Sequence, residues 1–505
     1  MLAKVFSAAL VGLDAQIIEV EVEVSYGLRH FSIVGLPDKA VEESKERIGS
    51  AIKSAGFKSP HSQPQRVLVA LAPADLKKEG AVYDLPMALG YLVAAKTIRF
   101  DPSKKIFLGE LALDGKLRPI KGVISLAMAA KEKGFSELVL PKENAKEAAL
   151  IKGLKIIGAE NLKEAVDYLE GKAEIKAAEL RGEITSKEIR YPINLAYIKG
   201  QDSSKRVLQI AAAGSHNLLM TGPPGAGKTL LAKSMPSILP ALSFEESLEV
   251  TKIYSIAGLL PKAEPLLRIR PFRSPHHTSS EVALIGGGNP PRPGEITLSH
   301  RGVLFLDEFP EFHRDVLESL RQPIEEGQIT LLRSKHSLTL PASFTLVAAS
   351  NPCPCGNLGS PEKSCLCTNS QIRMYRRKLS GPLMDRIDLF ITVPPVKYEK
   401  LVLDDGEDSS AKIRQRVEAA RAIQKERLGE NKTNSLMELP QIKKYCQIDS
   451  SSQTLLKRYV DSGKLSARGY HRVLKVARTI ADLDSSGKIT HQHLAEALMY
   501  RIKED

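Results

Sequence analysis

The chain has 505 residues, 43% of them hydrophobic and 26% charged, a length for which two to four domains are expected. No apolar run approaches the roughly 18 residues of a membrane span, and the N-terminus shows no cleavage site, which argues against a membrane anchor and a signal peptide. The net charge is +13, and residues 171–505 carry +11 of it. This excess favours a polyanionic partner for that part of the chain; a solubilising surface is the alternative.

Residues 1–171 are predicted to form a mixed α+β domain. The alternating stretch Ala15–Val24 and the apolar run Arg66–Leu71 are typical of strands. Lys39–Ala55 and Leu85–Ala95 have the apolar spacing of helices that face a core.

Two stretches of this domain resemble the ribosomal-S5-like catalytic domain of Lon protease. Asp114–Asn144 is the stronger match, and Lys77–Met87 is similar to the loop that carries the Lon nucleophile. No serine occurs in Lys77–Gly90, and the position of the catalytic lysine falls at Ile124. Because a Ser–Lys dyad needs both partners, we expect a domain that is not a protease and that docks a partner or a neighbouring subunit.

Residues 172–190 have few apolar anchors and many Lys, Glu and Ala, which is the composition of a linker. A phosphate-binding loop follows: a strand over Asn217–Thr221, a glycine-rich turn and a helix match G-x-x-x-x-G-K-[ST] at every fixed position. Lys228 would reach the β- and γ-phosphates of ATP, and Thr229 would hold Mg²⁺. The predicted nucleotide contacts of this turn are Gly222, Pro223, Pro224, Gly225, Ala226, Gly227, Lys228 and Thr229.

Polar side chains at two strand ends are expected beside that loop. The buried strand in Gly302–Phe309 ends in Asp307 and Glu308, where a second ATPase strand is needed. Asp307 would hold Mg²⁺ through water, and Glu308 would activate the attacking water; a surface acidic turn is the alternative. A further strand over Leu346–Ala349 leads to Asn351, which can sense the γ-phosphate.

Gly327–Leu346 predicts a β-hairpin with a cationic tip, where Arg333 and Lys335 would contact DNA phosphates; a solvated turn would look the same. Upstream, the adjacent histidines His276 and His277 could suggest a metal site. Neighbouring residues of a strand or helix point in different directions, so a structural or phosphate-near role is favoured over metal binding.

Cys353, Cys355, Cys365 and Cys367 form a C-x-C-x₉-C-x-C array. Four thiolates suit tetrahedral Zn²⁺, although C-x-C is tighter than the usual spacing, and reduced surface thiols are the alternative. The five cysteines of the chain do not make a disulfide framework, so a reducing cytoplasm is the expected location.

The α/β core is expected over residues 191–398 and a helical lid over 399–505. The order of phosphate loop, Asp-Glu strand, sensor strand, late arginine and lid resembles AAA+ ATPases. Several segments are closer still and resemble the ComM/YifB group of magnesium-chelatase-like proteins, a likeness that the Lon-like first domain completes. These segments are Tyr197–Thr229, Pro271–Gly288, Pro293–Phe309, Asn351–Gly356 and Ser466–Leu483.

This resemblance implies roles for further residues. Gln201 lies where related ATPases touch the adenine, although a helix N-terminus alone would explain it. Arg386 is similar to an arginine finger that reaches the γ-phosphate of the adjacent subunit, so a homohexamer is implied. Arg468 falls where the lid arginine, sensor 2, would sit, with Arg472 as the fallback.

The activity implied by the resemblance is ATP-driven branch migration of branched or single-stranded DNA in homologous recombination and natural transformation, with recombination proteins as partners. The alternative is a magnesium-chelatase-like ATPase subunit that drives Mg²⁺ into a porphyrin. Against it, the chain has its own N-terminal domain and cysteine loop, and no porphyrin or metal-insertion site is evident. An ATP-dependent protease is opposed by the missing serine and lysine.

Overall fold

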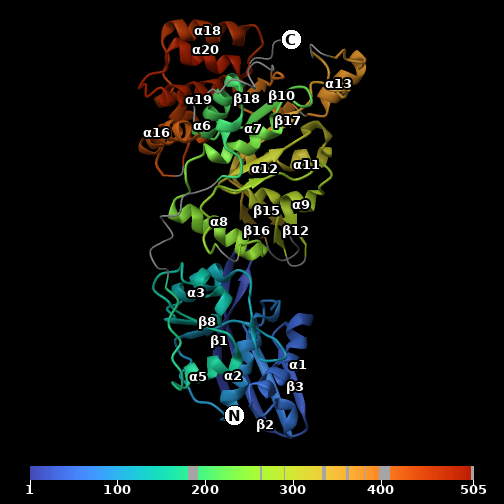
Figure 1. Ribbon diagram of the computed structural model, residues 1–505, viewed down its shortest axis with the longest axis vertical. Coiled ribbons are helices and arrows are strands. Elements are labelled where there is room, and N and C mark those ends of the chain that lie inside the picture. Colours follow the sequence, from blue (N-terminus) through green and yellow to red (C-terminus); the bar gives the residue numbers. More distant parts are fainter. Residues whose placement is uncertain are drawn as a thin grey trace. The chain divides into compact units, whose positions relative to one another are not determined.

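The structure is a computed structural model that describes residues 1–179, 191–261, 264–288, 291–332, 337–359, 363–379, 381–396, 410–430 and 432–501. The chain divides into two compact units, which the colours of Figure 1 allow the reader to follow along the sequence. The first unit comprises Met1–Glu188 and Ser247–Leu267, and the second comprises Ile189–Glu246 and Arg268–Asp505.

The first unit is built on a seven-stranded mixed sheet with strand order β3-β4-β2-β1-β5-β8-β9. Ile18, Val20 and Val22 are fully buried at alternate positions of β2, the period of a strand that turns one face to a core. The predicted mixed α+β fold is therefore confirmed. The strands are β1 (Leu2–Val11), β2 (Asp14–Tyr26), β3 (His30–Val34), β4 (Gln65–Ala72), β5 (Lys105–Phe107), β8 (Glu137–Pro141) and β9 (Lys155–Ala159), with a small pair β6 (Glu110–Leu111) and β7 (Leu117–Arg118).

Helices contribute to two apolar cores in this unit. Helices α1 (Lys39–Ser54), α2 (Asp84–Ala94) and α5 (Leu162–Leu169) belong to one core, and α3 (Val123–Glu132) and α4 (Ala145–Ala148) belong to the other. Ile124, the residue that the resemblance to Lon assigns to the lysine position, is fully buried in the second core. It packs as an ordinary core residue.

The segment Ser247–Leu267 lies inside the range expected for the ATPase core, yet it packs within the first unit. It carries most of helix α8 (Phe244–Ala257). Ser255 Oγ donates to the buried carboxylate of Glu147, and Lys252 Nζ lies 2.7 Å from Asp14. The chain therefore leaves the second unit, completes the first and returns.

The second unit contains a five-stranded parallel sheet with strand order β11-β14-β17-β10-β18. In chain order this is 2-3-4-1-5, the arrangement of AAA+ cores, so the predicted core is confirmed. The strands are β10 (Leu218–Thr221), β11 (Phe272–Arg273), β14 (Val303–Leu306), β17 (Thr345–Ser350) and β18 (Leu389–Thr392), with hairpins β12 (Gly286–Gly287)–β13 (Arg292–Pro293) and β15 (Gln328–Leu332)–β16 (Ser337–Pro341).

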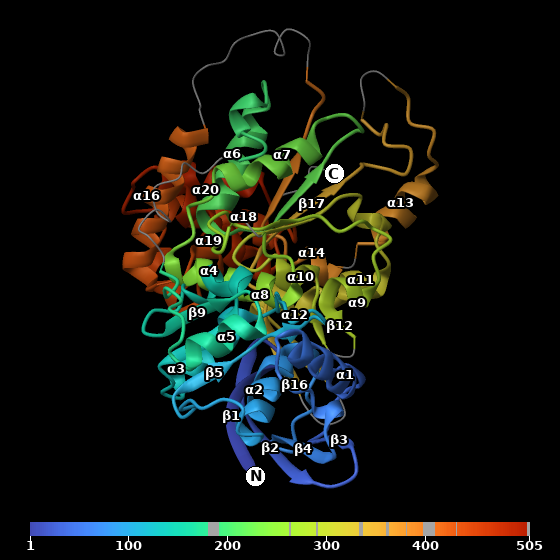
Figure 2. The same cartoon turned by 60° about the horizontal axis from the view of Figure 1, so that its bottom comes forward.

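Short helices surround this sheet, and longer helices form the C-terminal part. In both views α13 lies on the far side of the sheet from α16 and α19 (Figures 1 and 2). The core helices are α6 (Asp202–Gly214), α7 (Lys228–Ser234), α9 (Glu281–Ile285), α10 (Glu295–Leu298), α11 (Arg314–Ser319), α12 (Arg321–Glu326), α13 (Asn369–Arg377) and α14 (Gly381–Met384). The C-terminal helices are α16 (Ser410–Leu428), α17 (Leu439–Tyr445), α18 (Ser450–Asp461), α19 (Ala467–Leu483) and α20 (His491–Met499).

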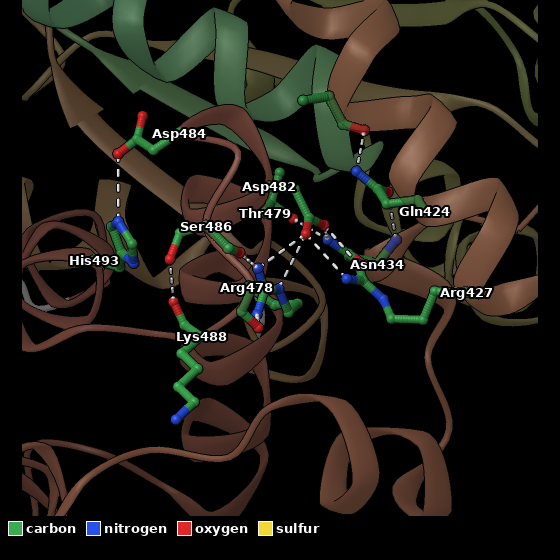
Figure 3. Close-up of polar contacts among 12 residues, drawn as sticks. Gln424, Arg427, Asn434, Arg478, Thr479, Asp482, Asp484, Ser486, Lys488 and His493 are labelled. Atoms are coloured by element: carbon green, nitrogen blue, oxygen red, sulfur yellow. Dashed lines mark hydrogen bonds and ion pairs between the residues drawn. The ribbon is translucent and has the colours of Figure 1, made fainter.

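A buried carboxylate organises the C-terminal helices (Figure 3). Asp482 accepts hydrogen bonds from Arg427 at 2.6 and 3.0 Å, from Arg478 at 3.1 Å and from Asn434 at 2.8 Å. Several donors are needed because a buried charge is costly when it is left unpaired. Among the helices that the structure describes, none is long and apolar enough to cross a membrane.

Candidate nucleotide site

The phosphate loop lies where β10 ends and α7 begins, and β10 pairs with β17 on one side and β18 on the other. Gly225 and Gly227 have φ values of +80° and +87°, which side-chain-bearing residues rarely adopt. A Cβ on Gly222 would lie 2.4 Å from the carbonyl oxygen of Val393, so this position has no room for one. The glycines of the motif therefore serve the turn itself and leave its backbone N–H groups open to an anion.

Lys228 is the first residue of α7 and is only 8% exposed. Its Nζ donates to the carbonyl oxygens of Gly222 at 2.6 Å and Pro223 at 2.9 Å, and to Asn351 Oδ1 at 3.2 Å. Burial lowers the pKa of Lys228, and the nearby Asp307 carboxylate opposes this shift. A buried ammonium group held by neutral oxygens is suited to bind the negative charge of a phosphate.

Asp307 and Thr229 provide the oxygen ligands that Mg²⁺ prefers. Thr229 Oγ1 donates to Asp307 Oδ2 at 2.6 Å, although the two residues are far apart in the sequence. The other carboxylate oxygen, Oδ1, accepts from the backbone N–H of Glu308 at 2.9 Å, which fixes the carboxylate. The pair fits Mg²⁺ that is bound together with nucleotide phosphates, and such an ion neutralises charge on the β- and γ-phosphates.

Glu308 follows in a left-handed conformation with φ +51°, unusual for a residue other than glycine. Its Oε2 lies 3.1 Å from Nδ1 of His277, and its side chain is 54% exposed. The carboxylate is thus oriented by a neighbour and still reachable by water. These are the conditions that a group activating an attacking water requires.

These residues surround one cavity of about 750 Å³. Asn351, directly after β17, belongs to the lining, and its role as a sensor stays a prediction. The cavity is lined by Pro224, Gly225, Ala226, Gly227, Lys228, Thr229, Leu230, Ser274, Pro275, His276, His277, Asp307, Glu308 and Asn351. Five of them, Leu230 and Ser274 to His277, are lining residues without a predicted binding role; the signals for the last four are the histidine pair, which leaves a phosphate-near role open, and their place in the resembling segment Pro271–Gly288.

Gln201 lies beside the phosphate loop, outside the cavity lining. Its side-chain amide donates to the carbonyl oxygens of Pro394 at 2.6 Å and Ala226 at 3.4 Å, and it accepts from Ser204 at 2.9 Å. Its φ is +61°. In this structure Gln201 ties the phosphate loop to the segment that follows β18; a contact with adenine stays a prediction.

The three candidate arginines lie outside the cavity lining as well. Arg386 is 12% exposed and pairs with Glu325 at 2.6 Å. Arg472 pairs with the buried Asp388, and this lowers the pKa of Asp388 despite the opposing effect of burial. Arg468 lies near the start of α19 with 68% of its side chain exposed, and its Nη1 is 3.9 Å from Oδ2 of Asp385. Arg472 thus has a structural partner, whereas Arg468 is accessible to a ligand.

The four cysteines of the predicted array come together after β17. Their Sγ atoms all lie within 4.8 Å of one another, and the three separations among Cys353, Cys355 and Cys365 are 3.4 to 3.6 Å. Backbone N–H groups of Asn357 and Leu366 lower the pKa of Cys355 to about 6.

The hairpin β15–β16 is present, with Gln328 opposite Pro341 and Leu331 opposite Leu338. Its tip, residues 333–336, lies outside the described residues. Arg333 and Lys335 therefore remain sequence predictions.

The parallel sheet, the phosphate loop and the acidic pair define a P-loop protein of the AAA+ class. Family models agree: "Magnesium chelatase, subunit ChlI" matches residues 194–401, "Subunit ChlI of Mg-chelatase" matches 20–144, and "Magnesium chelatase, subunit ChlI C-terminal" matches 407–501.

Several relatives match over almost the whole chain. The Escherichia coli protein YifB is 43% identical over 99% of this chain and 97% of its own length. The competence protein ComM of Haemophilus influenzae is 42% identical over the same shares. A magnesium-chelatase 38 kDa subunit of Cereibacter sphaeroides is only 23% identical, over 32% of this chain and 54% of its own length. The chain belongs to the ComM/YifB group of magnesium-chelatase-like AAA+ proteins, a family that suggests ATPase activity with ATP and Mg²⁺.

Proposed function

We propose that the protein is an ATP-driven DNA motor that moves branched or single-stranded DNA during homologous recombination and natural transformation. The observation that carries this proposal is a cavity lined by the phosphate loop, Asp307 and Glu308, in a chain that matches a competence protein over 99% of its length. The charge excess of +11 in residues 171–505 supports a polyanionic partner besides ATP.

In this proposal the hairpin β15–β16 binds the DNA. It connects the strand of Asp307 with the sensor strand, so a change of the bound nucleotide can move it. Arg333 and Lys335 at its tip would contact phosphates. Binding should therefore depend strongly on salt and little on base sequence.

The rival function is that of a chelatase ATPase subunit, which would share the same ATP site. The experiment that separates the two measures ATP hydrolysis by the purified chain alone, with forked or four-way-junction DNA, with the porphyrin-metallating machinery, and with an unfolded protein. We expect stimulation by the DNA and by none of the others. Stimulation by the porphyrin machinery alone would replace the DNA motor with the chelatase subunit.

The motor is proposed to work as a homohexamer, since no candidate arginine lines the cavity of its own chain. Arg386→Ala should keep ATP binding and lower hydrolysis by about 10³-fold or more, because an arginine finger stabilises charge in the transition state. Hydrolysis and nucleotide affinity are measured separately. Arg118→Ala, an exposed arginine of the first unit, serves as the control.

A mixture of Arg386→Ala and Glu308→Gln subunits should hydrolyse ATP faster than the average of the two variants alone, because a site between unlike subunits can combine an intact Glu308 with an intact Arg386. Full hydrolysis by Arg386→Ala as a monomer would contradict the ring.

We further propose that the cysteine array binds one Zn²⁺ per chain. Tetrahedral Zn–S bonds of about 2.3 Å place sulfurs about 3.8 Å apart, close to the separations of 3.4 to 3.6 Å seen here. The cysteines are free thiols, consistent with a reducing cytoplasm. Elemental analysis should find about one zinc per chain; a metal-free protein with four titratable thiols would refute the site.

A further inference from the structure

The cysteine loop packs directly on the phosphate loop. Cys353 is fully buried, and the N–H of Gly356 donates to its carbonyl oxygen at 3.0 Å, which closes a turn. Gly356 has a φ of +79°, and a Cβ there would lie 2.6 Å from Cδ of Pro224. The turn therefore packs so closely against Pro224 of the phosphate loop that position 356 has no room for a side chain.

The same turn adjoins the sensor. Asn351 precedes it by two residues, and its Oδ1 accepts a hydrogen bond from Lys228 at 3.2 Å. The turn therefore supports two residues of the cavity rim, Pro224 by packing and Asn351 through the chain.

The far end of the cysteine loop is anchored as well. Cys365 and Cys367 stand just before Thr368, whose side chain begins α13 with a capping box. At the other end of that helix, Lys378 forms an ion pair with Glu311 at 2.8 Å. Glu311 lies three residues after Glu308, so this ion pair ties the helix to the segment that follows the acidic pair. An ion held by all four thiolates would join the sensor end of the loop to the start of α13.

We propose that the metal-bound cysteine loop is a positioning element of the ATP site, which holds Pro224 and Asn351 in the geometry that binds nucleotide. This inference rests on the zinc site proposed above. Without the ion, the turn Cys353–Gly356 and the segment Cys365–Cys367 are no longer linked, and the cost of ordering them again opposes nucleotide binding. Loss of the metal should thus appear as a weaker affinity for ATP.

Two glycines of the same loop offer a matched test. Gly356→Ala places a methyl group against Pro224, whereas Gly359→Ala, at a similar φ of +75°, meets nothing within 4 Å. Both variants keep all four thiols. We expect each to retain zinc, and only Gly356→Ala to raise the Kd and the KM for ATP, by about tenfold.

A second variant removes the metal itself. Cys365→Ser combined with Cys367→Ser should lose zinc and weaken binding of a fluorescent ATP analogue by a similar factor, with circular dichroism confirming that the chain is folded. Should it fail to fold, the glycine pair decides. The positioning role is overturned if the metal-free variant, or Gly356→Ala, binds ATP like the wild type.

No assay in this set contains DNA, so its outcome is independent of the proposed motor activity. A wild-type protein without zinc would refute the metal site, and Gly356→Ala would then test the packing contact alone.

Discussion

Replacement of Lys228 by alanine is expected to weaken ATP binding by more than about a hundredfold, because charge-assisted hydrogen bonds to phosphate are lost. The side chain is 8% exposed at the start of α7 and is held by Gly222, Pro223 and Asn351, which places its ammonium group at the cavity. Titration with a fluorescent ATP analogue measures the effect.

Lys233→Ala is the matched control, since this lysine lies on the same helix but is exposed and outside the cavity lining. It should bind ATP like the wild type. Equal affinities for Lys228→Ala and Lys233→Ala would mean that ATP binds elsewhere.

Glu308→Gln is expected to have a different effect from Lys228→Ala. It should keep ATP binding, while ATP hydrolysis falls by about 10² to 10³-fold. Glutamine has nearly the same size but cannot accept the proton of the attacking water. It can still contact His277, which lies 3.1 Å from the native carboxylate, so the local arrangement should persist. Single-turnover hydrolysis and ATP affinity, measured together, separate these effects.

Glu326→Gln is the control for this change. Glu326 is exposed on α12, accepts a hydrogen bond from Gln322 at 2.9 Å and lies outside the cavity lining. If Glu308→Gln hydrolysed ATP as fast as Glu326→Gln, another group would have to activate the water.

Much of the ATP site could be predicted because its chemistry is local in sequence. The phosphate loop is one continuous motif, and the strand of Asp307 is four apolar residues followed by two acids. That Thr229 and Asp307 meet follows from parallel strands whose carboxyl ends share one edge of a sheet; the structure gives 2.6 Å.

Other features depend on which part of the chain a segment packs against, and the sequence pattern of a segment does not identify that part. Helix α8 shows a buried face, but nothing in its residues indicates that it completes the first unit. Strand β1 is rich in alanine and was not expected, since small residues weaken the alternating signal. The contact of His277 with Glu308 joins two loops, and that of Gly356 with Pro224 joins two others; only the fold reveals them.

The central claim, that ATP hydrolysis moves DNA, is tested most directly by branch migration of a synthetic four-way junction. The purified protein with ATP and Mg²⁺ should convert the junction into two duplexes. The reaction should stop when ATP is replaced by ADP, and it should fail when Arg333→Ala and Lys335→Ala are combined. A protein that hydrolyses ATP at the same rate with and without junction DNA, and leaves the junction intact, would contradict the account.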